Sequence, residues 1–223
     1  MEPRLIPLFP LNVVLFPGMV LPLRIFEPRY RLMIRRCLAA DRQFGVVLIA
    51  DGEEAGSPAT PRGIGTVAEI SGHEIMPDGQ IMIVTVGVRR FRLLERVEGE
   101  PYQQGRVELI DEGDPAAPVD ARLVSESTEA LETYLKGLAA VSNLAVSLPE
   151  EALSPIDLSY LMAASLQVDN DRKQALLETV PVDERLGRVL EAVREENARI
   201  ERFLAKGRSR GDFFYRGNRI SLN

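Results

Sequence analysis

Residues 7–30 decide the fold, and they read PLFPLNVVLFPGMVLPLRIFEPRY. Apolar side chains gather there in short runs, and prolines at positions 7, 10, 17 and 22 interrupt or separate the runs. Proline lacks a backbone N–H, so it occurs at strand edges, kinks and turns rather than in the middle of a regular sheet. We therefore predict short, irregular strands over Leu5–Phe9, Val13–Phe16 and Val20–Phe26.

More strands follow along the first half of the chain. The apolar run Phe44–Ala50 is typical of a strand that is buried on both faces. The turn Pro77-Asp78-Gly79 predicts a tight hairpin, because proline presets φ and Asp-Gly tolerates the positive φ of such a turn. The polar, Gly- and Pro-rich segment 51–62 is expected to be a mobile loop. Short strands with frequent turns indicate a barrel or a small sandwich, and the remaining strands are expected over Ile64–Ile70, Gln80–Val97 and Val107–Ile110.

One helix interrupts these strands. Pro28 suits a first helical turn. The apolar residues after it recur at helical spacing and predict one buried stripe, made of Tyr30, Met33, Ile34, Cys37 and Leu38. The arginines at positions 29, 31, 35 and 36 fall largely off this stripe. They indicate a solvated face, which could also attract acidic partners.

The second half of the chain is helical. The segment Asp111–Pro118 marks the change and is interpreted as a linker, after which apolar residues recur at helical spacing. Ser154 and Asp169 are each suited to cap the start of a helix. A longer helix opens at Val182 and extends to about residue 206, which is long enough to project or to mediate self-association. We predict a β-barrel over residues 1–112, a helical bundle over 119–206 and a polar, basic tail over 207–223.

Composition narrows the classes of function. The chain has 223 residues and a net charge of −6, and residues 120–201 carry 16 acidic against 8 basic side chains. This acidic region would repel phosphate backbones, which argues against nucleic-acid binding there. No apolar run approaches the roughly 18 residues that a membrane span requires. The first residues lack the parts of a secretory signal, and the lone cysteine cannot form an internal disulfide, so we expect a cytoplasmic, reducing setting.

Catalytic and cofactor chemistry is not visible in the sequence. The single cysteine, Cys37, and the single histidine, His73, could formally be a nucleophile–base pair. The apolar stripe, however, would raise the pKa of the Cys37 thiol and so lower its reactivity. A structural zinc site usually takes four Cys and His ligands, which the chain cannot supply. No lysine lies between a glycine and a Ser or Thr, as a phosphate-binding loop requires. An all-carboxylate magnesium site stays open, but no acidic cluster has a recognisable spacing, so we expect no cofactor and no enzymatic activity.

The stretch quoted first resembles the opening of the Lon amino-terminal domain family. The family's Pro-Leu, Phe-Pro and Leu-Pro-Leu steps have counterparts at Pro10-Leu11, Phe16-Pro17 and Leu21-Pro22-Leu23. The run Arg24–Tyr30 is more similar to the family's stand-alone bacterial members than to its full proteases. Further similarities occur in the family's order and extend the resemblance over about residues 4–205, among them Gly65-Thr66-Val67, Ile83–Arg92 and Asp183-Glu184-Arg185-Leu186.

This resemblance implies a fold and a role. The implied fold is α+β, with a PUA-like β pseudo-barrel followed by an all-helical subdomain. In the full proteases this region engages unfolded or tagged proteins and helps the hexamer to assemble. The chain shows no counterpart of the ATPase or of the Ser-Lys peptidase dyad. The resemblance therefore implies a non-catalytic protein- or peptide-binding module, an adaptor or regulator in protein quality control whose partners would be unfolded or tagged proteins and a protease.

The candidate docking residues are apolar side chains beside the barrel, where extended chains can bind. They are Phe16, Met19, Phe26 and Tyr30, and the competing interpretation is that they belong to the core, most strongly for Tyr30 on the helical stripe.

A second hypothesis is RNA binding by the barrel through Arg89-Arg90-Phe91-Arg92, although arginines on a strand would alternate between its faces. A small-ligand enzyme is a third hypothesis, with the least support.

Overall fold

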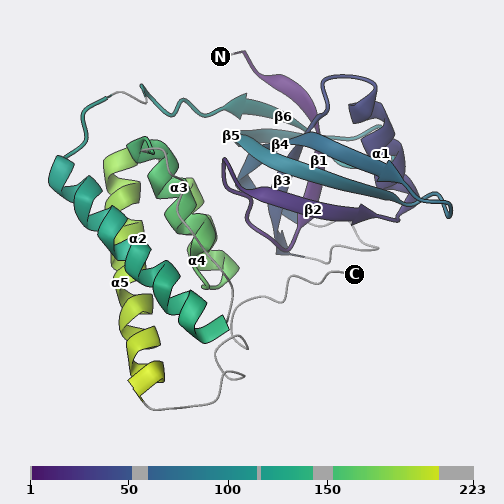
Figure 1. Cartoon of the computed structure of the whole chain (residues 1–223). Coiled ribbons are helices and arrows are strands. Elements are labelled where there is room, and N and C mark those ends of the chain that lie inside the picture. The colour runs from purple at the N-terminus through teal and green to yellow at the C-terminus, as the bar shows by residue number, and fades with distance from the viewer. Residues whose placement is uncertain (1, 52–59, 115–116, 143–152, 206–223) are drawn as a thin grey trace. The chain divides into compact units, whose positions relative to one another are not determined.

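The computed structural model describes residues 2–51, 60–114, 117–142 and 153–205 (Figure 1). The chain divides into two compact units, Met1–Asp111 and Glu112–Leu222. The predicted tail over 207–223 and most of the predicted loop over 51–62 lie outside the described residues. None of the helices in the described ranges is long and apolar enough to span a membrane.

The first unit is a mixed sheet closed into a barrel, with one helix. Its elements are β1 (Arg4–Leu11), β2 (Val20–Ile25), α1 (Pro28–Leu38), β3 (Gln43–Asp51), β4 (Thr60–Ile75), β5 (Ile81–Val97) and β6 (Gln104–Leu109). The strand order is β2-β5-β4-β3-β1-β6, and β5 also pairs with β6. Strands β1 and β3 run parallel, and the other pairs are antiparallel. The pairing of β5 with β6 closes a ring from which β2 is left out, attached along β5 (Figure 1).

The β4–β5 hairpin makes this closure possible. The turn predicted at Pro77-Asp78-Gly79 is confirmed, since Gly79 has a φ of 80° and the Met76 N–H donates to the Gln80 carbonyl at 2.8 Å. Strand β5 is long enough to pair with β2 through its first half and with β6 through its second half. Residues 60–62, predicted as loop, belong instead to β4, because Thr60 and Pro61 pair with the end of β3.

The predicted strand over Val13–Phe16 is wrong. These residues form an irregular crossing between β1 and β2 in which three consecutive apolar side chains are buried, whereas a strand would alternate between its two faces. Groups of the barrel hold the crossing in place of strand pairing. The Thr66 hydroxyl donates to the Leu15 carbonyl at 2.6 Å, and the Gly18 N–H donates to the Gly87 carbonyl at 2.8 Å.

The larger core of the first unit lies between the sheet and α1. The predicted helical stripe is confirmed, with Tyr30, Met33, Ile34 and Cys37 buried and Leu38 partly buried against the same cluster. Tyr30 stacks on Phe9 of β1, with the two ring centroids 4.2 Å apart. A smaller cluster around Phe91 fills the rest of the barrel. Helix α1 therefore contributes most of its apolar face to this core.

The burial of Cys37 has a measurable consequence. Burial, aided by the charge of Asp41, raises the pKa of the thiol to about 12, whereas the pKa in an unfolded chain is about 8.5. Because the thiolate is the nucleophile, we expect iodoacetamide at about pH 8 to modify the native chain at least about a hundredfold more slowly than the urea-unfolded chain, followed by intact mass. The unfolded chain loses its proton first, so folding stability should also fall as the pH rises above about 8.5. Equal modification rates in the two states would contradict this burial.

The second unit is helical. Its described helices are α2 (Ala121–Ser142), α3 (Pro155–Ser165), α4 (Asn170–Glu178) and α5 (Val182–Ala205). The predicted caps are confirmed, because the Ser154 hydroxyl accepts from the Asp157 N–H at 3.1 Å and the Asp169 carboxylate accepts from the Arg172 N–H at 2.8 Å. A barrel followed by helices confirms the predicted α+β class.

Helix α5 uses its apolar row inside this unit. The row packs against α2 and α3 and contains Leu186, Val189, Leu190, Val193 and Ile200, all buried. Asn197 interrupts the row, and its side-chain amide donates to the Ala130 carbonyl of α2 at 3.0 Å. Gly137 of α2 lets the helices approach, because a Cβ there would lie 3.0 Å from the Ile200 side chain. Self-association through α5 stays a prediction.

Candidate functional site

The structure separates the four predicted docking residues. Phe16 is fully buried in the crossing between β1 and β2, and Tyr30 is only 4% exposed because it stacks on Phe9. Met19 is partly buried against the same core. Phe26, directly after β2, is 54% exposed. Only Phe26 presents most of its side chain to a partner, while Phe16 and Tyr30 are core residues in this structure.

An exposed apolar surface lies on the outer face of β2 and of the first half of β5. We call it the β2–β5 patch and define it by Val20, Pro22, Met82 and Val84. Val20 is 56% exposed, Val84 41% and Met82 37%. The register pairs Pro22 with Val84, and directly paired residues share one face of a sheet. Val20 and Met82 belong to the two neighbouring outward pairs, Val20–Val86 and Arg24–Met82, so all four side chains lie on the same face.

The alternation of the two strands produces the patch. Leu21 and Ile25 of β2 are buried in the core. Ile81 and Ile83 of β5 are buried with them. Because side chains alternate with a period of two, the residues between these positions point outward. Apart from Arg24, the outward positions of β2 and of the first half of β5 are apolar, although the solvent face of an antiparallel sheet is usually polar.

Charged residues border the patch. In the register, Met82 lies between Arg24 of β2 and Glu74 of β4. The Arg24 side chain is exposed, and its Nε donates to the neutral Gln80 Oε1 at 2.5 Å. Within the described ranges Arg24 has no carboxylate partner. A positive charge therefore lies beside the apolar surface.

Strand β2 also leaves one backbone edge open. In the part of the chain that the structure describes, β2 pairs with β5 and with no other strand. The Gly87 N–H donates to the Met19 carbonyl at 2.9 Å. Because the backbone N–H and C=O groups of a strand point to alternate sides, those of Leu21, Leu23 and Ile25 point toward β5, as that of Met19 does. The backbone groups of the residues between them point away from β5. The open edge is therefore formed by the backbone groups of Val20, Pro22 and Arg24.

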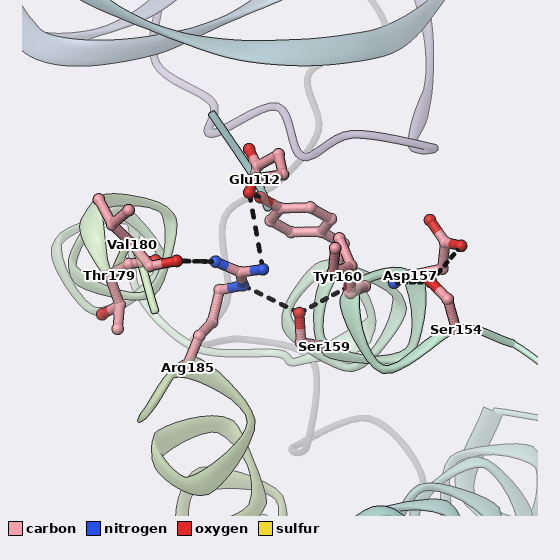
Figure 2. Close-up of polar contacts among 9 residues, drawn as sticks. Glu112, Ser154, Asp157, Ser159, Tyr160, Thr179, Val180 and Arg185 are labelled. Carbon is pink, nitrogen blue, oxygen red and sulfur yellow. Dashed lines mark hydrogen bonds and ion pairs between the residues drawn. The ribbon is translucent and has the colours of Figure 1, made fainter. Parts of the chain in front are cut away.

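The helical unit contains a buried polar centre around Arg185 (Figure 2). The Arg185 side chain is fully buried. Its Nε donates to the Ser159 hydroxyl at 2.9 Å, and a terminal nitrogen donates to the carbonyls of Thr179 and Val180 at 2.9 and 3.1 Å. One guanidinium group thus ties α3 to the turn between α4 and α5.

Tyr160 and Glu112 complete this centre. The guanidinium carbon of Arg185 lies 4.3 Å from the centre of the Tyr160 ring, and its other terminal nitrogen lies 3.8 Å from the Glu112 carboxylate. The same carboxylate accepts from the Tyr160 hydroxyl at 2.6 Å (Figure 2). The buried charge is therefore both matched and hydrogen-bonded, which is the arrangement of a structural centre. Arg185 is the arginine of the Asp-Glu-Arg-Leu step at 183–186.

The metal-binding and Cys37–His73 hypotheses can be compared with the described residues. They contain no group of three or more His, Cys, Asp or Glu side chains that could hold a metal ion. The Cys37 thiol is buried and its pKa is about 12, so it is a poor nucleophile near neutral pH. His73 is exposed on β4.

The segment proposed for RNA binding does not form a basic surface with an aromatic platform. Phe91 is fully buried in the smaller core cluster, so its ring cannot stack on a base. Arg90 is fully buried as well. Arg89 and Arg92 are exposed, but they are two separate charges rather than a continuous patch.

Residues 5–195 match the family model of the ATP-dependent protease La (LON) substrate-binding domain. The chain belongs to the Lon substrate-binding domain family. It is 31% identical over 192 residues to Lon protease 2 of Myxococcus xanthus, a match that covers 85% of this chain and 23% of that protein. It is 35% identical over 189 residues to the Lon protease of Paraburkholderia phytofirmans, covering 82% of this chain and 23% of that protein. The chain thus spans less than a quarter of the curated Lon proteases it matches.

Solved structures of Lon amino-terminal domains have the same fold. A Lon N-terminal domain protein from Xanthomonas campestris superposes with a TM-score of 0.66 at 25% identity, covering 84% of this chain and 98% of that chain. The amino-terminal domain of a Mycobacterium avium complex Lon protease gives a TM-score of 0.61 at 19% identity, covering 86% of this chain and 99% of that chain, which bears on the fold alone. The resemblance to Lon amino-terminal domains drawn from the sequence is confirmed.

The sequence predicts that the residues of the β2–β5 patch lie in strands, but it does not predict that they are exposed. A signal for them was present in residues 81–86, IMIVTV, where no position is charged. Such a run predicts a strand buried on both faces. In this Lon-family barrel, however, β5 has one face in the core and one face exposed, so the outward half of the run becomes surface.

Proposed function

We propose that this member of the Lon substrate-binding domain family binds extended apolar segments of unfolded or tagged proteins and performs no catalysis of its own. The match of residues 5–195 to a substrate-binding domain supports the role. The observation that carries the proposal is the β2–β5 patch, an exposed apolar surface shared by β5 and by β2, which among the described strands lies outside the closed ring. An adaptor or regulator role beside a protease is part of the same proposal.

The proposal predicts a binding defect without a folding defect. Replacing Val20 and Val84 together with serine is expected to weaken binding of an unfolded polypeptide at least about tenfold, because a fully buried valine contributes about 1.5 kcal/mol. Both side chains are exposed in the free protein, so its stability should change by less than about 0.5 kcal/mol. Fluorescence anisotropy with a labelled, reduced and carboxymethylated protein measures the affinity.

Leu94 provides a matched control for this experiment. It is 47% exposed and lies on the second half of β5, away from the patch. Leu94→Ser should leave the affinity within about twofold. If the double variant binds as tightly as the parent chain, the patch is not the binding surface. If the parent chain binds no unfolded polypeptide, the proposed function itself is wrong.

A further inference from the structure

We propose that the open edge of β2 takes up a substrate segment as an added antiparallel β-strand, so that backbone hydrogen bonds as well as apolar contacts hold it. This inference rests on the proposed function and specifies how the segment binds. An apolar patch alone would bind a hydrophobic polypeptide in any conformation. An apolar patch that continues to an unpaired strand edge selects an extended one, because a bound strand satisfies the edge and covers the patch together.

The hydrogen-bonding groups of this edge are defined by the register. Val20 and Arg24 each offer an N–H and a carbonyl, and Pro22 offers a carbonyl alone. An antiparallel segment could therefore form hydrogen-bonded pairs at three successive outward positions and lose one bond at the middle position. The edge residues are exposed, so water can solvate the carbonyl of the segment that faces Pro22.

Pro22 also indicates which occupant suits the edge. If two β2 strands from two copies of this chain paired with each other, each would present a proline, and two donors would be missing from the same short ladder. A segment of another protein without proline loses only one. The edge therefore pairs less well with a second copy of this chain than with a substrate segment, so the expected occupant is a segment of another protein.

The side chains of the added strand follow from the same geometry. Residues paired with Val20, Pro22 and Arg24 would project on the outer face, beside the β2–β5 patch. Apolar residues are expected next to Val20 and Pro22. An acidic residue is expected next to Arg24, whose side chain is bonded to the neutral Gln80. The preferred substrate segment therefore alternates apolar residues with residues of any kind and carries an acid near one end.

Backbone methylation of a peptide tests this mode directly. The probe is a fluorescent ten-residue peptide in which valine and serine alternate, with one aspartate replacing a terminal valine. When the valines lie over the patch, their own N–H groups point at β2 and those of the serines point away. N-methylation of the valines should weaken binding to the full chain about tenfold, since the two hydrogen bonds donated by the valines opposite Val20 and Pro22 are lost. N-methylation of the serines should leave the affinity within about threefold.

Each outcome of this test bears on the proposal. If both methylated peptides bind like the parent peptide, side chains alone are recognised and strand addition is overturned, while the proposed function stands provided that the patch variant still weakens binding. If the parent peptide does not bind although the chain binds the carboxymethylated protein, strand addition is overturned and the proposed function stands. If sedimentation shows a dimer of the chain that persists at saturating peptide and is abolished by Arg24→Pro, the edge is occupied by a second copy and the foreign-strand proposal is overturned.

A pair of variants tests the same edge from the side of the protein. Arg24→Pro removes one outward N–H, and Arg24→Thr removes the same side chain but keeps the N–H. Arg24→Pro should bind the unmethylated peptide about threefold or more weakly than Arg24→Thr does. Circular dichroism and the melting temperature establish that both variants fold. Equal affinities in two folded variants would contradict a bond at this position.

Discussion

Replacing Arg185 with methionine is expected to lower the free energy of unfolding of the helical unit by about 3 kcal/mol. Methionine fills part of the space but leaves the two carbonyl groups of Thr179 and Val180 without their buried donor. The Glu112 carboxylate loses its countercharge at the same time. The carboxylate still accepts the hydrogen bond from the Tyr160 hydroxyl and is partly solvated. The loss of unfolding free energy is therefore expected in the lower part of the range for a broken buried ion pair.

Urea unfolding followed by the helical circular dichroism signal measures this effect, and the same helix supplies a control. Arg188 is 55% exposed and pairs with Glu184 one turn away at 2.6 Å, so Arg188→Met should cost less than about 0.5 kcal/mol. Arg185→Lys keeps the charge but loses the planar fork of donors, and it should fall between the two. Similar transition midpoints for Arg185→Met and Arg188→Met would show that the buried centre does not stabilise the unit.

Replacing Gly87 with alanine is expected to destabilise the barrel unit by about 3 kcal/mol, near the upper end of the range for overpacking. The new Cβ would lie 2.2 Å from the Phe16 carbonyl oxygen and 3.2 Å from the Thr66 side chain. The crossing cannot simply move away, because the backbone of Gly87 accepts from the Gly18 N–H and donates to the Met19 carbonyl. Since these bonds also place the start of β2, peptide binding at the patch should weaken as well.

Gly72 is the matched control for this substitution. It lies on the neighbouring strand β4, and a Cβ added there would meet no heavy atom within 4 Å. Gly72→Ala should change the stability by less than about 0.5 kcal/mol. Scanning calorimetry of the full chain gives both values. A Gly87→Ala chain that melts at the parent temperature would show that the crossing is free to adjust.

Local signals predicted most of the fold. The spacing of Tyr30, Met33, Ile34 and Cys37 depends only on the helical period, and the caps at Ser154 and Asp169 depend only on neighbouring backbone groups. The crossing over 13–16 was mistaken for a strand because a buried irregular segment and a buried strand have the same composition. What distinguishes them is the anchoring of the segment by Thr66 and Gly87, far along the chain.

The candidate site was harder to predict than the fold. Whether an apolar side chain is core or surface depends on which face of a strand it occupies and on what covers that face. Phe16 and Phe26 look alike in the sequence, yet one is fully buried and the other 54% exposed. The open edge of β2 is a property of the whole strand order, which residues 20–25 do not encode by themselves.

The bond between Asn197 and the Ala130 carbonyl has a consequence for how α2 and α5 settle against each other. A purely apolar seam would allow the two helices to slide by one turn at little cost. Such a shift would carry the amide away from its carbonyl and bury it without a partner, at a cost of about 1–3 kcal/mol. The asparagine therefore fixes the register of α2 against α5. A leucine at this position would stabilise the pair more but would not select one register.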